Sequence, residues 1–248
     1  MADTNNIVRG ILSQMRELRF TAMADELTAI VSDPVNQNLG TFELLSRITD
    51  AEFRKRTDTK VERLIKSARF NNPKASLDSL DYAPERKLNK NIIDQLRDNS
   101  YIQNHRNIIV EGPTGAGKSF LVQAFGCQAC YGKYHVSYYG MLDLIFELST
   151  NNSPDKILHC LKQLAKPDLL IIDDFMMTSV MADTQDYLLK LIDMRNTHSS
   201  IIISSQLMDV EWKRRIHDPA IGEAIIDRLI HNAFRITIEG PSMREKYN

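Results

Sequence analysis

A phosphate-binding motif occupies residues 112–119, where three glycines, a lysine and a serine follow the pattern G-x-x-x-x-G-K-[ST]. Glycine permits the backbone conformations that turn successive N–H groups inward around an anion. Lys118 supplies a positive charge for the β- and γ-phosphates of ATP, and the Ser119 hydroxyl can bind Mg²⁺. Because an apolar strand-like run precedes the motif and an apolar helical stretch follows it, the sequence predicts a true nucleotide site, or P-loop. The residues expected to bind ATP are Gly112, Pro113, Thr114, Gly115, Ala116, Gly117, Lys118, Ser119 and Phe120.

Two adjacent carboxylates, Asp173 and Asp174, end a second apolar run at 169–172. Such a run is typical of a strand buried on both faces of a parallel sheet, and ligands bind outside the carboxyl ends of these strands. In isolation the two acids would equally fit a cap on the next element. Together with the P-loop, they predict that Asp173 holds Mg²⁺ with Ser119, and that Asp174 orients or deprotonates the water that attacks the γ-phosphate.

Two further polar side chains stand where catalysis could use them. Gln206 follows the apolar run at 201–204, and it would lie next to Asp173 and Asp174 if both strands flank the P-loop strand. The alternative for Gln206 is an ordinary turn at a strand end. Arg228 stands in an otherwise apolar helical stretch, and its neighbour Asp227 does not share its face. Since an uncompensated buried arginine is costly, Arg228 is expected to be paired or functional.

A basic stretch lies in the first third of the chain. Between residues 47 and 74, nine side chains are basic and four are acidic. Helical spacing places Arg56, Lys60 and Arg63 in one stripe. The run would fit a solvated helix face, but its density predicts contacts with DNA phosphates. The cations expected to contact DNA are Arg54, Arg56, Lys60, Arg63, Lys66 and Arg69.

Helical periodicity dominates the residues before 71, whereas strands alternate with helices after 76. In the long helix expected at about 41–70, the apolar side is formed by Phe53, Val61, Leu64, Ile65 and Ala68. The expected strands are 108–110, 136–139, 169–172, 201–204 and 234–238. They predict an α/β fold with a five-stranded parallel sheet and helices on both faces. We therefore expect a small all-helical domain at 1–70, a linker at 71–76 and a nucleotide-binding domain at 77–248.

Composition excludes several classes of protein. The 248 residues include 31 basic and 32 acidic side chains, so any nucleic-acid binding must come from a local patch. No apolar run approaches the roughly 20 residues of a membrane span, and no signal-peptide pattern opens the chain. Cys127 and Cys130 lie in the helical stretch after the P-loop and lack a second Cys/His pair, which favours packing over metal binding. The expected location is cytoplasmic, without a membrane contact.

Short, different motifs are spread along nearly the whole chain, at 18–27, 64–70, 77–82, 166–174, 211–212, 218–219, 227–229 and 239–244. In this order they resemble the IstB-like ATPases, helpers of bacterial transposition that belong to the AAA+ class and are close to the helicase loader DnaC. The resemblance implies an AAA+ core behind an N-terminal helical domain, with no C-terminal lid domain. It also implies ATP-dependent assembly into a homo-oligomer on duplex DNA, which delivers or activates an IstA-like transposase at a target site.

The same resemblance assigns roles to individual residues. Gln206 matches a position that senses the γ-phosphate, and Arg228 matches the arginine finger that reaches a neighbouring subunit's nucleotide. Arg244 matches a second arginine near the phosphates. The chain departs from the pattern at Asp174, where many AAA+ proteins carry glutamate, and the shorter side chain would slow hydrolysis. It departs again at 175–177, where Phe-Met-Met replaces the usual small residue.

Two other functions fit parts of the sequence. A DnaC-like loader would use the same nucleotide site but would open a helicase ring on single strands. A small-molecule P-loop kinase would need an acceptor pocket and a mobile lid, and nothing after Asp174 supplies an obvious one. The number of matched motifs favours the transposition helper, although fold alone does not fix function.

Overall fold

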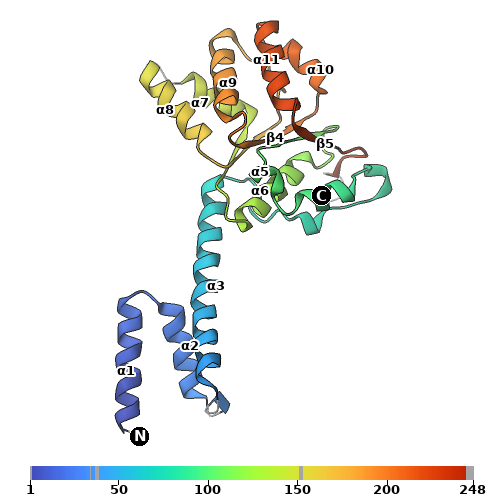
Figure 1. Ribbon diagram of the computed structural model, residues 1–248. Coiled ribbons are helices and arrows are strands. Elements are labelled where there is room, and N and C mark those ends of the chain that lie inside the picture. The colour runs from blue at the N-terminus through green and yellow to red at the C-terminus, as the bar shows by residue number, and fades with distance from the viewer. Residues whose placement is uncertain (1, 34, 37–38, 151–152, 244–248) are drawn as a thin grey trace. The chain divides into compact units, whose positions relative to one another are not determined.

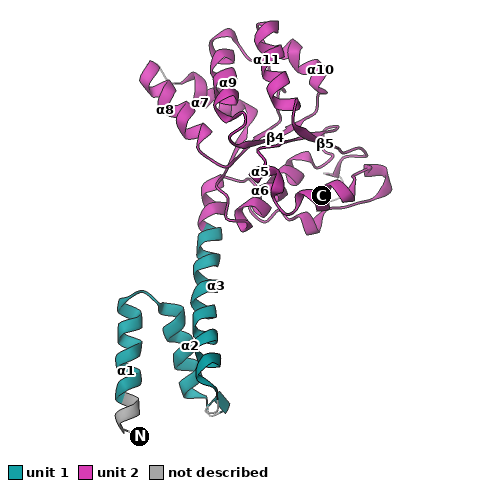
Figure 2. Ribbon diagram, viewed as in Figure 1, with its two compact units in different colours: residues 1–62 teal, residues 63–248 magenta. Residues whose placement is uncertain are grey.

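The computed structural model of the protein describes residues 2–33, 35–36, 39–150 and 153–243. It divides into two compact units, residues 1–62 and residues 63–248, called here the N-terminal unit and the C-terminal unit (Figure 2). The division falls within the long helix α3 (Thr41–Ala68), which agrees closely with the helix expected at 41–70.

The N-terminal unit is helical throughout its regular structure. Helices α1 (Ala2–Glu17) and α2 (Thr21–Ser32) precede α3. A small buried cluster forms where Leu27 and Ile30 of α2 meet Ile48 of α3. The apolar side predicted for α3 is correct at Val61, Leu64 and Ala68, which are buried, and Ile65 is half-buried. It is wrong at Phe53, which is 66% exposed.

The C-terminal unit is built on five parallel strands, as predicted. They are β1 (Asn107–Glu111), β2 (Val136–Gly140), β3 (Leu169–Asp173), β4 (Ser200–Ser205) and β5 (Ala233–Thr237). Their spatial order is β2-β3-β4-β1-β5. Gln206 was expected beside the two acids if the strand before it, β4, and the strand before the acids, β3, both flanked the P-loop strand β1. This expectation is wrong in one respect, since only β4 lies next to β1. Strand β3 lies on the far side of β4, so the ends of β3 and β4 are still neighbours.

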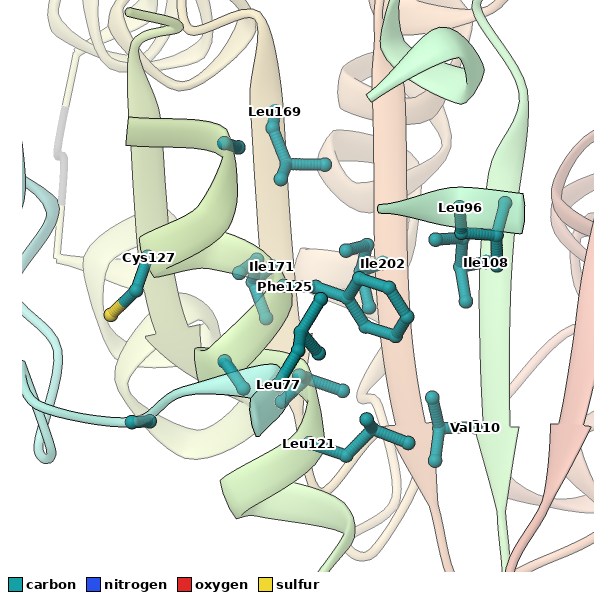
Figure 3. Packing of buried hydrophobic residues seen from close by; sticks show 14 of the residues in the cluster. Leu77, Leu96, Ile108, Val110, Leu121, Phe125, Cys127, Leu169, Ile171 and Ile202 are labelled. Atoms are coloured by element: carbon teal, nitrogen blue, oxygen red, sulfur yellow. The ribbon is translucent and has the colours of Figure 1, made fainter. Parts of the chain in front are cut away.

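Helices cover both faces of the sheet (Figure 1). On one face lies α6 (Lys118–Tyr131), and its Leu121 and Phe125 pack against Ile108 and Ile202 (Figure 3). On the other face lie α7 (Met141–Ser149), α8 (Pro154–Ala165), α9 (Ala182–Arg195) and α11 (Pro219–Ile230). The shorter elements are η2 (Leu77–Ser79), η3 (Pro84–Arg86), α4 (Lys90–Leu96), α5 (Ser100–Gln103), α10 (Asp209–Trp212) and η4 (Lys213–Arg215).

Side chains of successive strand residues alternate between the two faces of the sheet, so each strand contributes to the hydrophobic cluster on either face. Ile108 and Val110 belong to the α6 side, whereas Ile109 belongs to the other side.

Cys127 and Cys130 are buried free thiols in α6, as the packing interpretation predicted, and burial raises their pKa to about 11 and about 12. No helix of the described residues combines the length and apolarity that a membrane crossing needs.

Candidate nucleotide-binding site

The P-loop connects β1 to α6 at the carboxyl edge of the sheet. Gly115 and Gly117 take φ values of 78° and 92°, a region that glycine adopts without steric cost. Side chains here would also collide with neighbours: a Cβ on Gly115 would meet Ser242, and one on Gly117 would lie 3.0 Å from Arg86 Nη2. The glycines of the motif are therefore required by both backbone conformation and close packing.

A cavity of about 850 Å³ opens beside this loop. Six of the residues expected to bind ATP line it, namely Thr114, Gly115, Gly117, Lys118, Ser119 and Phe120. Asp174 and Gln206, which come from the ends of β3 and β4, line it as well. Gly112, Pro113 and Ala116 belong to the loop but not to the cavity lining. A pocket of this size with one lysine and several hydroxyl and backbone groups suits a nucleotide.

Lys118 is held inside the loop that it serves. It is 5% exposed, and its Nζ donates to the Pro113 carbonyl at 2.9 Å. This contact keeps the ammonium group beside the backbone turn that would surround the phosphates.

The two acids have different environments. Asp173 is 4% exposed; its Oδ2 accepts from the Tyr138 hydroxyl at 2.7 Å, and its Oδ1 accepts from Ser204 Oγ and from the Asp174 N–H. Asp174 has a φ of 54°, an uncommon value for a residue other than glycine, and its side chain lines the cavity. Burial, with the bond to Asp173, raises the pKa of Tyr138 above its ordinary value, so this phenol remains a proton donor.

The bulky residues after the acids form a buried support. Phe175 and Met176 are fully buried, and the Phe175 ring packs edge-on against Trp212 with centroids 4.9 Å apart. Met177 turns outward and lines the cavity. Phe175 and Met176 thus pack into the hydrophobic cluster on this face of the sheet, and they anchor the turn that carries Asp174.

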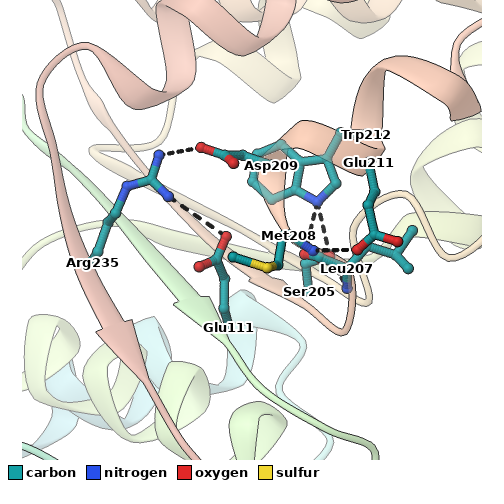
Figure 4. Close-up of polar contacts among 8 residues, drawn as sticks. All are labelled: Glu111, Ser205, Leu207, Met208, Asp209, Glu211, Trp212 and Arg235. Carbon is teal, nitrogen blue, oxygen red and sulfur yellow. Dashed lines mark hydrogen bonds and ion pairs between the residues drawn. The ribbon is translucent and has the colours of Figure 1, made fainter.

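Trp212 also fixes the end of β4, from which Gln206 extends. Its indole N–H donates to Ser205 Oγ and to the Leu207 carbonyl, both at 3.1 Å (Figure 4). Gln206 accepts through Oε1 from the Thr114 hydroxyl of the P-loop at 2.5 Å. Gln206 therefore lies at the cavity and is bonded to the P-loop.

A charged group stands next to the same strand ends. Arg235 of β5 contacts Asp209, and its Nη1 lies 3.8 Å from Glu111 Oε1 at the end of β1 (Figure 4). Burial raises the pKa of Glu111, while Arg235 acts in the opposite direction. These contacts join β5 to the end of β1 and to the start of α10.

Of the two arginines assigned by resemblance, the structure describes only Arg228, which stands apart from the cavity. Arg228 on α11 contacts Asp193 of α9 through Nε and donates to the Ala224 carbonyl at 2.8 Å through Nη1. It is thus paired, which is one of the two outcomes expected from the sequence, and it does not line the cavity. Arg244 lies outside the described residues.

Sequence reasoning missed several residues that line the cavity. Ser79, Leu80, Asp81 and Arg86 come from the segment before α4, and Met243 comes from the other end of the chain. The Met243 N–H donates to the Gly115 carbonyl at 2.9 Å. For Ser79, Leu80, Asp81 and Met243 the only signal was the motifs at 77–82 and 239–244, and Arg86 lies outside both motifs.

The cations expected to bind DNA all lie on or directly after α3, and all six are exposed. Lys60 and Arg63 keep their places in the stripe. Arg56 is engaged within the N-terminal unit: Nε donates to Glu52 Oε1 at 2.7 Å, and the guanidinium lies 5.0 Å from the Phe20 ring centroid. Arg69 lies 6.0 Å from the ring centroid of Tyr139.

The donor set fits Mg²⁺. A hydroxyl from Ser119 and a carboxylate from Asp173 are hard oxygen ligands, and Mg²⁺ in nucleotide sites is held by one or two such groups together with phosphates and water. No group of three or more His, Cys, Asp or Glu residues gathers anywhere in the described ranges, so a dedicated all-protein cage is absent from them.

Comparison with known sequences gives one consistent family. The profile of a family described as IstB-like ATP binding protein matches residues 13–248. An insertion sequence ATP-binding protein of Sinorhizobium fredii is 32% identical over 233 residues, which cover 94% of each chain. An ATP-binding protein in an insertion sequence of Mycobacterium tuberculosis is 26% identical over 233 residues, 94% of this chain and 92% of that one.

Solved structures give the fold. The DnaC helicase loader matches with a TM-score of 0.52 at 18% identity, over 69% of this chain and 99% of that chain. AMPPCP-bound DnaA from Aquifex aeolicus matches with a TM-score of 0.56 at 22% identity, over 72% of this chain and 54% of that one. At these identities the likeness concerns the AAA+ fold alone.

Proposed function

Because the chain belongs to the family of IstB-like ATP-binding proteins, we propose that it is an ATP-dependent DNA-binding assembly factor that helps a transposase engage target DNA. The observation that carries the proposal is the convergence of Lys118, Asp174 and Gln206 on one cavity beside the P-loop. The relatives belong to insertion sequences, which supports an IstA-like transposase as the partner.

Several residues at or beside the cavity have a part in the proposed ATP hydrolysis. The P-loop backbone and Lys118 bind the phosphates, and Gln206 contacts the γ-phosphate from the end of β4. Ser119 and Asp173 hold Mg²⁺, which when bound would neutralise charge on the β- and γ-phosphates. Asp174 orients the attacking water. The buried turn at Phe175 keeps Asp174 in place without help from the ligand.

The remaining parts of the proposal concern assembly. Arg228 reaches a neighbouring subunit's nucleotide, so hydrolysis depends on a homo-oligomer, and Arg244 assists near the phosphates. The exposed cations of α3 contact the phosphates of duplex DNA. The protein acts in the cytoplasm, where ATP and target DNA are available.

Three proteins test this function: the parent, Lys118→Ala and Asp174→Asn. We expect the parent to bind labelled random-sequence duplex DNA more tightly with ATP, and to retain a co-expressed transposase on an affinity column. Lys118→Ala should lose nucleotide affinity, whereas Asp174→Asn should bind ATP normally and turn it over slowly. Equal loss of ATP affinity in the two variants would contradict the division of roles.

Helicase loading is the runner-up, and the DNA substrate separates it from target selection. A loader should prefer single strands and should associate with a replicative helicase in preference to the transposase. Competition between duplex and single-stranded DNA of equal length, with ATP present, measures this preference. Clear preference for the single strand, with no retention of the transposase, would favour the loader.

A further inference from the structure

Two consecutive residues after α3 form hydrogen bonds with side chains of the nucleotide-binding fold. The Asn71 side-chain amide donates to the Tyr138 hydroxyl at 3.3 Å, and the Asn72 backbone N–H donates to Gln123 Oε1 at 2.7 Å. All four residues lie within the C-terminal unit. These bonds directly follow the helix that carries the cations expected to bind DNA.

The first path of hydrogen bonds runs from Asn71 through Tyr138 and ends on Asp173, the acid expected to bind Mg²⁺. Tyr138 accepts from Asn71 and donates to Asp173 Oδ2 at 2.7 Å, which uses both the acceptor and the donor capacity of a phenol. Its ring lies 6.1 Å from that of Phe70, so the residue before Asn71 also packs on it. Because the other Asp173 oxygen accepts from Ser204, the carboxylate is fixed from both sides.

The second path runs from Asn72 through Gln123 and ends on Ser119, the other expected Mg²⁺ ligand. Gln123 is 4% exposed and stands one turn after Ser119 in α6. Its Nε2 donates to the Ser119 carbonyl at 3.0 Å while its Oε1 accepts from the Asn72 N–H. One amide side chain therefore links the first turn of α6 to the segment after α3.

Buried polar side chains are normally hydrogen-bonded, and that alone would explain a single bond of this kind. It does not explain why adjacent residues begin two separate paths that end on the two metal-binding residues. Groups that orient metal ligands tune metal affinity without touching the metal. We propose that Tyr138 and Gln123 are positioning residues for Asp173 and Ser119, and that Asn71 and Asn72 couple this positioning to DNA bound on α3.

This inference rests on the proposed function, since it needs both Mg²⁺ at Asp173 and DNA at α3. It goes further in naming the residues through which DNA would regulate the nucleotide site. DNA that changes the end of α3 would alter the two bonds from Asn71 and Asn72. The orientation of the metal ligands, and with it the affinity for Mg²⁺, would change in turn.

Tyr138→Phe tests the first path, because it removes one hydroxyl and keeps the ring that packs on Phe70. The readout is binding of a fluorescent ATP analogue during Mg²⁺ titration, which does not depend on turnover. We expect normal affinity without Mg²⁺ and an increase of about 10-fold in the Mg²⁺ concentration at half-saturation. Tyr139→Phe is the matched control: it removes the same group from the same strand on the opposite face, and it should titrate like the parent. Gln123→Met should resemble Tyr138→Phe.

Asp173→Asn separates failure of the inference from failure of the proposed function. If Asp173→Asn titrates like the parent, the metal site itself is wrong, and the inference falls with it. If Asp173→Asn needs more Mg²⁺ but Tyr138→Phe does not, the metal site stands and the positioning role is overturned. Circular dichroism and Mg²⁺-free affinity establish that each variant is folded.

Asn71→Ala tests the coupling. In the parent, duplex DNA should lower the Mg²⁺ concentration at half-saturation by about 5-fold or more, the lower range of allosteric couplings. In Asn71→Ala this shift should disappear while DNA affinity remains. No DNA-dependent shift in the parent, or an undiminished shift in Asn71→Ala, would overturn the coupling.

Discussion

The acid expected to bind Mg²⁺ in the C-terminal unit and the cations expected to bind DNA in the N-terminal unit are held in opposite ways. In the C-terminal unit Asp173 is 4% exposed and bonded on both oxygens, and Arg195 is fully buried. In the N-terminal unit the cations Arg54, Arg56 and Lys60 are exposed. A nucleotide site needs groups that are in place before the ligand arrives, whereas a DNA backbone can be followed by mobile surface cations.

Apolar side chains show the same contrast. The β1 residues Ile108, Ile109 and Val110 are fully buried, whereas Phe42 and Phe53 of α3 are 88% and 66% exposed. The sheet specifies its own core, whereas the N-terminal unit leaves large apolar side chains mostly exposed. Substitutions should therefore act strongly and individually in the C-terminal unit, and weakly and additively in the N-terminal unit.

The largest expected effect belongs to Arg228, on the C-terminal unit. If it completes a neighbouring subunit's site, Arg228→Ala should lower ATP turnover by about 10³ while leaving nucleotide binding intact. Asp193→Asn is the matched control, since it removes the ion pair but keeps the arginine, and it should lose far less activity. Mixtures of Arg228→Ala with Asp174→Asn should regain activity. An absence of recovery at every ratio would show that Arg228 acts only within its own chain.

Arg195 should give the largest change in stability. Its guanidinium donates to the carbonyls of Leu164, Ala165, Pro167 and Ser200, and although burial lowers its pKa to about 9, it stays charged at neutral pH. Arg195→Met would leave these buried carbonyls unpaired, at a cost of at least about 3 kcal/mol. Urea unfolding followed by the fluorescence of the single tryptophan, Trp212, measures the loss. The exposed control Arg214→Met should change stability by about 0.5 kcal/mol or less.

The sequence predicted what is contiguous. The P-loop, the two acids and the five strands are each encoded in a short run, where local conformation and burial determine the structure. Continuous apolar runs, without alternating polar residues, identified the strands, because a strand of a parallel sheet is buried on both faces. The sequence could not order the strands, so Gln206 was expected beside the acids for a partly wrong reason.

What the sequence could not predict depends on distant segments. Arg86 lies against Gly117, and Tyr138 bonds Asp173, only because the fold brings together residues about 30 apart or more. The error at Phe53 has another origin, since helical spacing marks an apolar side without showing how far each of its residues is buried. The pairing of Arg56 with Glu52 follows ordinary i, i+4 spacing and could have been read from the sequence.

The basic stripe should give a smaller effect that sharpens the comparison. Arg56 already contacts Glu52 and Phe20, so we expect Lys60 and Arg63 to supply most of the phosphate contacts of the stripe. The pair Lys60→Gln/Arg63→Gln should reduce the slope of log affinity against log salt by about 1.8, and Arg56→Gln by less than about 0.9. Fluorescence anisotropy with random-sequence duplex and ATP measures both. The exposed α8 pair Lys156→Gln/Lys162→Gln is the control, and curves that overlap the parent's would favour a merely solvated face.

The smallest expected effect concerns Glu52, a buried acid of the N-terminal unit. Its Oε2 accepts from the N–H groups of Ala22 and Met23 at the start of α2, and its Oε1 accepts from Arg56. Burial acts to raise the pKa of Glu52, but these hydrogen bonds outweigh it and hold the pKa below the ordinary value of 4.5. A lowered pKa means that the carboxylate stabilises the folded unit above about pH 4.5. This stability is lost as the pH falls through the folded-state value.

Glu52→Gln should therefore destabilise α2 by about 1 kcal/mol at pH 7, and the difference from the parent should shrink in acid. Hydrogen exchange of peptides from α2, corrected for the intrinsic rate at each pH, measures it within the N-terminal unit. Glu62→Gln, an exposed acid of the same helix α3, should leave α2 protection unchanged at every pH. A constant difference between Glu52→Gln and the parent from pH 7 to pH 3 would mean that the charge of Glu52 does not hold the start of α2.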